Sequence, residues 1–159
     1  MDCYHLAAGI AIRDGRLLMV ASRYPSHPAP LWNLPGGRQL PGELLAETVI
    51  REVFEETGVR AEAGELAYVS ESYDGERHFL SATFVLELCG EAPLDSARGD
   101  RARDHVVEVG WVPLAEVGGR IVVAVVREPL LAYLNRDLSR RYAGFHEAGI
   151  TIEWPADSQ

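Results

Sequence analysis

Short apolar runs separated by turns occupy most of the chain and predict an arrangement rich in β-strands. An Asp-Gly pair follows two of these runs, at Asp14-Gly15 and at Asp74-Gly75, and such pairs strongly favour tight hairpins. We therefore expect two β-hairpins. The runs that we interpret as strands or extended segments are His5–Ile12, Arg16–Ser22, Leu31–Pro35, Glu65–Asp74, Phe79–Cys89 and Val106–Val112.

Two stretches instead have the 3.6-residue periodicity of helices. The first begins near Glu43 or Leu44 and ends at Gly58, because glycine readily takes the left-handed conformation that follows a last helical turn. The second is Glu128–Arg140, with Pro129 in its first turn. Hairpins interleaved with two helices predict an α/β fold, with a mixed sheet packed between helices. The apolar stripe of the first helix is Ala46, Val49, Ile50, Val53 and Thr57.

The remaining segments connect these elements. Arg23–Pro30 contains three prolines and is predicted to be an exposed loop, and Gly90–Asp104 is polar and predicted to be mobile. Pro113–Val117 fits a short helical turn, and Ile150–Trp154 fits either a last strand or an ordered tail. Because the sequence contains no internal repeat and no inter-domain linker, we expect a single domain over residues 1–159.

The composition excludes several classes of function. The formal net charge of −9 argues against broad binding to nucleic acid or to anionic membranes, which requires a surplus of lysine and arginine. Cys3 and Cys89 form no metal-binding pair and suit a reducing cytoplasm. The first residues lack a basic lead, so we expect no signal peptide and no membrane span. We therefore expect a cytoplasmic protein, for which a monomer and a homodimer are both open.

The first predicted helix carries three glutamates whose placement is unfavourable for the helix alone. Glu52, Glu55 and Glu56 share an arc of roughly 100°, where like charges repel by roughly 0.2–0.5 kcal/mol per pair. The last two also lie at the helix end where the dipole disfavours negative charge. Either this face is simply solvated, or a cation binds to it. Carboxylates at this spacing suit Mg²⁺ or Mn²⁺, which prefer oxygen ligands.

The surrounding sequence favours the cation. The stretch Gly37–Val59, GRQLPGELLAETVIREVFEETGV, resembles the Nudix box, G-x5-E-x7-R-E-U-x-E-E-x-G-U, in which U is aliphatic. A full match by chance is expected in roughly fewer than one sequence per million. The box covers 23 of the 159 residues, and it fits at Gly37, Glu43, Arg51, Glu52, Val53, Glu55, Glu56, Gly58 and Val59.

The resemblance implies a Nudix-type α/β/α sandwich around a mixed β-sheet. It also implies divalent-metal-dependent hydrolysis of a phosphoanhydride bond in a nucleoside diphosphate linked to another moiety. In some members of the family, the glutamate that corresponds to Glu52 also orients or deprotonates the attacking water. The arginine that corresponds to Arg51 holds the glutamates in place. Glu43 is open between a metal ligand, an outer partner of the ligands and a charge that favours the helix N-terminus. The implied metal ligands are Glu52, Glu55, Glu56 and the backbone carbonyl near Gly37.

Outside the box, four residues are candidates for contact with the substrate. Arg23 follows a strand where related enzymes often place an arginine, although it is equally a loop charge. Trp32 lies beside the box and either stacks on a base or is part of the core. Tyr73 and His78 flank the second hairpin. Candidates for a further acid, acting as base or metal ligand, are Asp104 and Glu108.

The substrate expectation rests mainly on absent features. The sequence lacks the marks of hydrolases acting on ADP-ribose, diadenosine polyphosphates or coenzyme A, which favours a nucleoside triphosphate or a small nucleotide conjugate. The main alternative is a catalytically silent nucleotide-sensing module, although such relatives usually lose box glutamates. A third hypothesis, isomerisation of isopentenyl diphosphate, needs a cysteine in a matching motif, and Cys3 and Cys89 lie outside one.

Overall fold

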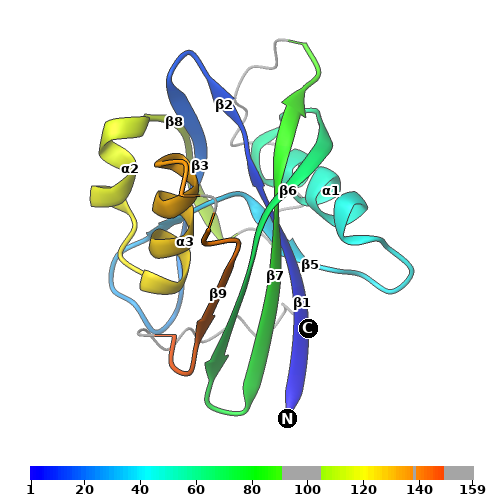
Figure 1. Ribbon diagram of the computed structural model, residues 1–159, viewed down its shortest axis with the longest axis vertical. Coiled ribbons are helices and arrows are strands. Elements are labelled where there is room, and N and C mark those ends of the chain that lie inside the picture. The colour runs from blue at the N-terminus through cyan, green and yellow to red at the C-terminus, as the bar shows by residue number, and fades with distance from the viewer. Residues whose placement is uncertain (91–104, 138, 149–159) are drawn as a thin grey trace.

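The computed structural model describes residues 1–90, 105–137 and 139–148, which form two β-sheets with helices on both sides (Figure 1). The strands are β1 (Asp2–Ile10), β2 (Ile12–Arg13), β3 (Arg16–Ser22), β4 (Leu31–Asn33), β5 (Gly36–Arg38), β6 (Ala61–Asp74), β7 (Arg77–Leu88), β8 (Val106–Pro113) and β9 (Tyr142–Phe145). The helices are α1 (Leu45–Thr57), α2 (Leu114–Arg120) and α3 (Ala124–Leu134). Among the described residues, no helix is long and apolar enough to cross a membrane.

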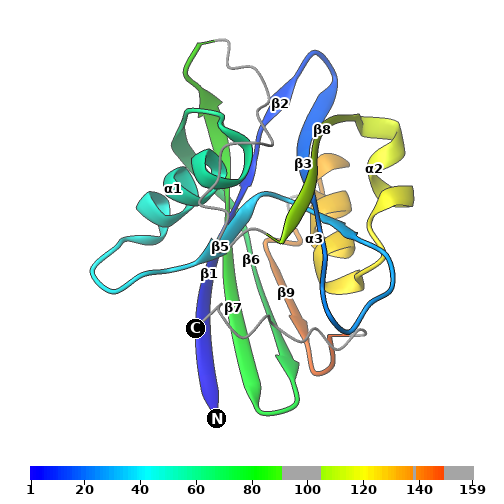
Figure 2. The same cartoon turned by 180° about the vertical axis from the view of Figure 1, so that it is seen from behind.

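The larger sheet is mixed. Its five strands have the order β5-β1-β7-β6-β9, and β1 runs parallel to β7 as β9 does to β6. The second sheet has four strands. Three of them have the order β2-β3-β4, and the fourth, β8, also pairs with β3. Helix α1 lies on one side of the strands and helices α2 and α3 on the other (Figure 1 and Figure 2). This arrangement confirms the expected α/β fold with a mixed sheet between helices.

Alternation along the central strands divides the core into two layers, because successive side chains of a strand point to opposite faces. In β3, Leu17 and Met19 pack in a cluster that includes Leu130 of α3. Leu18, between them, packs in the cluster that includes Val49 of α1. The strands are therefore apolar on both faces, which explains why their sequences read as continuous apolar runs.

Both predicted hairpins are present. Asp14 and Gly15 have φ angles of 51° and 70°, the left-handed conformations that a two-residue turn requires, and they join β2 to β3. In the second hairpin, Asp74 still pairs with Arg77, so the turn is one residue later than predicted. Its first residue is Gly75, with a φ of 58°.

Helix α1 agrees closely with the sequence pattern. It is followed by Gly58 at a φ of 75°, which confirms the predicted end. Two residues of the predicted stripe are not buried, because Ala46 is only half-buried and Ile50 is 37% exposed. Thr48 is buried instead, and its hydroxyl donates a hydrogen bond to the carboxylate of Glu43. The buried residues of the helix are Thr48, Val49, Val53 and Thr57.

The prediction for the second helix was wrong at both ends. Helix α3 begins at Ala124 rather than Glu128. Val123 and Val126 pack in a buried cluster, and this packing favours one more helical turn before Glu128. It ends at Leu134, before Arg136 adopts a left-handed φ of 60°. Strands β5 and β9 were not predicted. The predictions for residues 91–104 and 150–154 lie outside the described residues.

The close pairing of β5 with β1 depends on a glycine. We expect Gly36→Ala to lower the free energy of unfolding by about 1–3 kcal/mol, because a Cβ atom there would lie 2.3 Å from the carbonyl oxygen of Ala7. Gly119→Ala in α2 is the control, since a Cβ atom there meets nothing within 4 Å and alanine favours helix. Urea denaturation measures both, and equal stabilities would contradict the packing argument.

Candidate active site

The loop between β5 and α1 is fastened to the helix by carboxylates. Glu47 accepts a hydrogen bond from the backbone N–H of Leu44 at 2.7 Å, which satisfies one of the unpaired donors at the helix start. Glu43 accepts from the backbone N–H of Leu40 at 3.0 Å and from the hydroxyl of Thr48 at 2.8 Å. These contacts fix where the first turn of α1 stands relative to β5.

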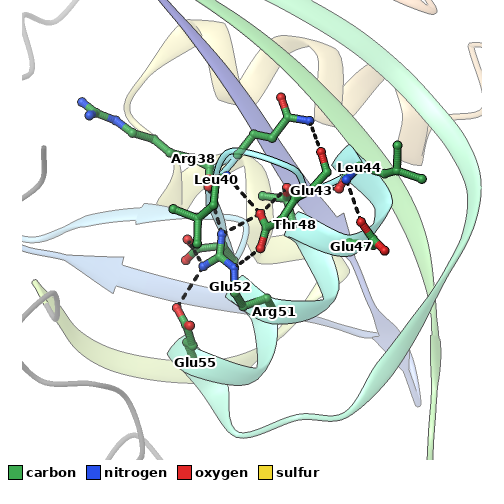
Figure 3. A network of polar contacts seen from close by, with 10 residues as sticks. Arg38, Leu40, Glu43, Leu44, Glu47, Thr48, Arg51, Glu52 and Glu55 are labelled. Carbon is green, nitrogen blue, oxygen red and sulfur yellow. Dashed lines mark hydrogen bonds and ion pairs between the residues drawn. The ribbon is translucent and has the colours of Figure 1, made fainter.

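Arg51 is the centre of the polar network in Figure 3. Its Nε donates to Glu43 at 2.5 Å, and its Nη1 donates to Glu52 at 2.8 Å and to Glu55 at 3.2 Å. Its Nη2 donates to the backbone oxygen of Arg38 at 3.0 Å. These contacts raise the pKa of the guanidinium, so Arg51 is a permanent cation. One side chain therefore joins β5, the loop and three glutamates.

Glu43 is committed to this network. The Arg51 guanidinium lowers the pKa of its carboxyl to about 2, and the contacts with Leu40 and Thr48 act in the same direction. Both carboxylate oxygens already accept hydrogen bonds. Of the three roles that the sequence left open, the geometry favours a partner of Arg51 that positions the other acids.

Glu52 and Glu56 reach back to the two glycines of β5. A Cβ atom on Gly37 would lie 2.5 Å from the carboxyl carbon of Glu52, so only glycine leaves room for that side chain. Glu56 accepts a hydrogen bond from the backbone N–H of Gly36 at 2.7 Å. The face of α1 thus brings the carboxylates of Glu52 and Glu56 against the β5 backbone.

The residues present fit a hard divalent cation in their chemistry. Glu52, Glu55, Glu56 and the backbone near Gly37 offer oxygen ligands only, as Mg²⁺ and Mn²⁺ prefer. In the part of the chain that the structure describes, no three histidine, cysteine or acidic side chains already stand together as a metal-binding group. The positive charge that these carboxylates contact is the guanidinium of Arg51, which donates hydrogen bonds to Glu52 and Glu55.

A cavity of about 530 Å³ opens beside these glutamates. The aromatic part of its wall was not predicted from the sequence. The rings of Tyr4 and Phe79 stack with their centroids 5.4 Å apart, and the guanidinium of Arg38 lies 4.1 Å from the centre of the Tyr4 ring. Alternation along β1 places Tyr4 in the wall, a signal that the sequence contained. The cavity-lining residues that we use below are Tyr4, Tyr24, Arg38, Glu52, Glu56 and Phe79.

Tyr24 also lines the cavity, although the sequence placed it in an exposed loop. The side chain is buried, and burial raises its pKa to about 12, with the negative charge of Glu56 adding to the shift. Its hydroxyl is therefore neutral and able to donate to an anionic group. The available signal was an aromatic residue two positions after the end of the buried strand β3.

The four residues outside the box that were candidates for substrate contact do not line the cavity. Arg23 is exposed, and its backbone N–H donates a hydrogen bond to the carbonyl of His105 at 2.7 Å. Trp32 is half-buried, with Arg120 5.1 Å from its ring centre. Tyr73 and His78 stack on each other with their centroids 4.5 Å apart. Of the candidate acids, Glu108 is exposed on β8 and Asp104 lies outside the described residues.

Comparison with known proteins gives a consistent family. The sequence model of the NUDIX domain matches residues 4–134. A Mycobacterium tuberculosis protein that carries the name of a mutator protein, MutT4, is 32% identical over 117 residues, which cover 70% of this chain and 44% of that protein. CTP pyrophosphohydrolase of Escherichia coli K12 is 35% identical over 65 residues, which cover 41% of this chain and 48% of the relative.

Solved structures support the fold. A NUDIX hydrolase from Nitrosomonas europaea matches with a TM-score of 0.71 at 22% identity, over 89% of this chain and 93% of that one. The matched region spans less than half the length of the two curated relatives, at 44% and 48%.

The Arg51 network is testable without any substrate. We expect a double-mutant cycle of Arg51→Met and Glu43→Gln to give a coupling of about 1 kcal/mol or more, because the pair is largely shielded and shares one network. The exposed pair of Arg140 and Asp137, 3.3 Å apart, is the control and should show no measurable coupling. Urea denaturation provides the four free energies of each cycle. Equal couplings in both cycles would show that Arg51 does not organise the site.

Proposed function

The chain belongs to the NUDIX domain family, and from this premise we propose that it is a divalent-metal-dependent hydrolase of a phosphoanhydride bond in a nucleoside diphosphate linked to another moiety. One observation carries the proposal. The box glutamates Glu52, Glu55 and Glu56, together with Gly37, line a single cavity large enough for a small nucleotide.

Residues of this chain would divide the work as follows. Glu52, Glu55, Glu56 and the carbonyl near Gly37 would hold Mg²⁺ or Mn²⁺. When bound, such an ion neutralises charge on the phosphoryl oxygens and lowers the pKa of a coordinated water. Arg51 keeps the glutamate side chains in position. A water oxygen bonds to phosphorus as the anhydride P–O bond breaks, and a cavity carboxylate such as Glu52 takes the proton of that water.

The cavity wall supports a nucleotide as substrate. Tyr4 and Phe79 offer aromatic surface on which a base can stack, and Arg38 adds a cation beside it. The name of the relative CTP pyrophosphohydrolase favours a nucleoside triphosphate, in agreement with the sequence analysis. The alternative of a silent nucleotide-binding module is less favoured, because every glutamate of the box is present. A cytoplasmic location fits the two free cysteines.

The activity proposal is tested with a panel of nucleoside triphosphates and nucleotide conjugates, scored for released phosphate and pyrophosphate. We expect hydrolysis only with Mg²⁺ or Mn²⁺, and we expect Glu56→Gln to lower kcat by roughly a hundredfold or more. The amide oxygen of the variant still accepts from Gly36, so folding should be retained.

Glu47→Gln is the matched control for that experiment. Glu47 lies on the same helix, is exposed, and caps the helix through a contact that glutamine also makes. We expect its kcat to stay within about twofold of the wild type. Full activity of Glu56→Gln, or equal losses in both variants, would contradict the proposed role of the box glutamates. Nucleotide binding without turnover by the wild type would favour the silent module.

Two parts of the molecule are candidates for substrate recognition, the aromatic wall of the cavity and the 23–30 loop. We propose that both Tyr4 and Arg23 contact the substrate, as the cavity and the sequence respectively suggest. We expect Tyr4→Ala to raise KM by roughly tenfold with little change in kcat, the result of lost ground-state binding. Because Arg23 is exposed and Tyr4 lines the cavity, the effect of Arg23→Ala should be smaller. Steady-state kinetics with saturating metal measure both. A larger KM change in Arg23→Ala would move the pocket to the 23–30 loop.

A further inference from the structure

A second cluster of reactive side chains lies on strands β1, β7 and β6 of the five-stranded sheet. Side chains of β1 alternate, so Cys3 lies on the opposite face from Tyr4. The parallel pairing of β1 with β7 places Cys3 directly beside His78. The Cys3 sulfur is 3.9 Å from Nδ1 of His78, and Nε2 of His78 is 2.7 Å from a carboxylate oxygen of Glu71. A thiol, an imidazole and a carboxylate therefore follow one another in order.

The histidine ring is held in place from two directions. The ring of Tyr73 stacks on it with a centroid distance of 4.5 Å and an interplanar angle of 7°. Glu71 is itself fixed by the hydroxyl of Tyr142, which donates to its other carboxylate oxygen. A nucleophile beside a base that a third group orients is the arrangement that activates cysteine nucleophiles.

The hydrogen bonds determine which ring nitrogen carries the proton. The bonds from Tyr142 and His78 lower the pKa of Glu71, so this group is a carboxylate and only accepts hydrogen bonds. Nε2 of His78 must therefore donate to it. In the neutral ring, Nδ1 then has a lone pair, and this lone pair faces the sulfur of Cys3.

We propose that Cys3, His78 and Glu71 form a reactive-thiol site at which Cys3 exchanges with a low-molecular-weight disulfide and becomes a mixed disulfide. Nδ1 of His78 takes the S–H proton, and the Cys3 sulfur attacks one sulfur of the disulfide. The disulfide bond breaks as the new S–S bond forms, and the departing thiolate takes the proton from His78. One disulfide is consumed and one thiol released, so no other oxidant is needed. The exchange shares no chemical step with the proposed hydrolysis, and Cys3 and His78 do not line the cavity, although Glu71 does.

The chain contains its own reference for the test. Cys89 is also free and exposed, just after the end of β7. We would incubate the full chain with oxidised glutathione at neutral pH and follow both cysteines by mass spectrometry of their peptides. We expect Cys3 to form the mixed disulfide at least about fivefold faster than Cys89. Equal rates, or a faster Cys89, would overturn the proposal.

Variants separate activation from simple exposure. We expect His78→Gln to reduce the rate of Cys3 to that of Cys89, and Glu71→Gln to reduce it in the same direction. His5→Gln is the matched control, because His5 is exposed two residues from Cys3 on the same face of β1. Its Cys3 rate should not change. An unchanged Cys3 rate in His78→Gln would contradict the assignment. If that variant does not fold, a Glu71→Gln variant with an unchanged Cys3 rate would contradict it equally.

Discussion

The arrangement of this site depends on one half-buried cation, the guanidinium of Arg51. It contacts Glu43, Glu52 and Glu55, which would otherwise repel one another, and it ties them to the backbone of β5. One positive charge against three carboxylates leaves the cluster negative, so the network organises the acids without cancelling their charge. The same interaction therefore joins the loop to the helix, and in our proposal it keeps the acids in position for a divalent cation.

The second constraint is a pair of close approaches at β5, one to the backbone of β1 and one to a side chain of α1. Gly36 fits against the backbone of Ala7, and Gly37 leaves the space that Glu52 occupies. Because Glu52 and Glu56 lie against β5, a shift of α1 along the sheet would move their carboxylates away from the β5 backbone. The cavity wall differs in kind, since its aromatic residues, among them Tyr4, Tyr24 and Phe79, lie outside the box. Our proposal therefore assigns phosphoanhydride chemistry and base recognition to separate parts of the fold.

Local patterns predicted the elements whose signals are local. The Asp14-Gly15 turn, the end of α1 at Gly58 and the acids of α1 follow from spacing and from glycine. Contacts between distant segments were not predictable in the same way. The pairing of β9 with β6 and the burial of Tyr24 depend on packing against elements far away in the sequence. The role of Glu43 required knowing that Arg51 reaches it across the loop.

The central claim is that the Arg51 network holds the box glutamates ready for a divalent cation at the cavity. The most direct measurement is an anomalous difference map from crystals soaked in Mn²⁺. The account predicts one strong peak bonded to oxygens of Glu52 and Glu56, with Arg51 still in contact with Glu43. A peak remote from these glutamates, or none at saturating Mn²⁺, would contradict it.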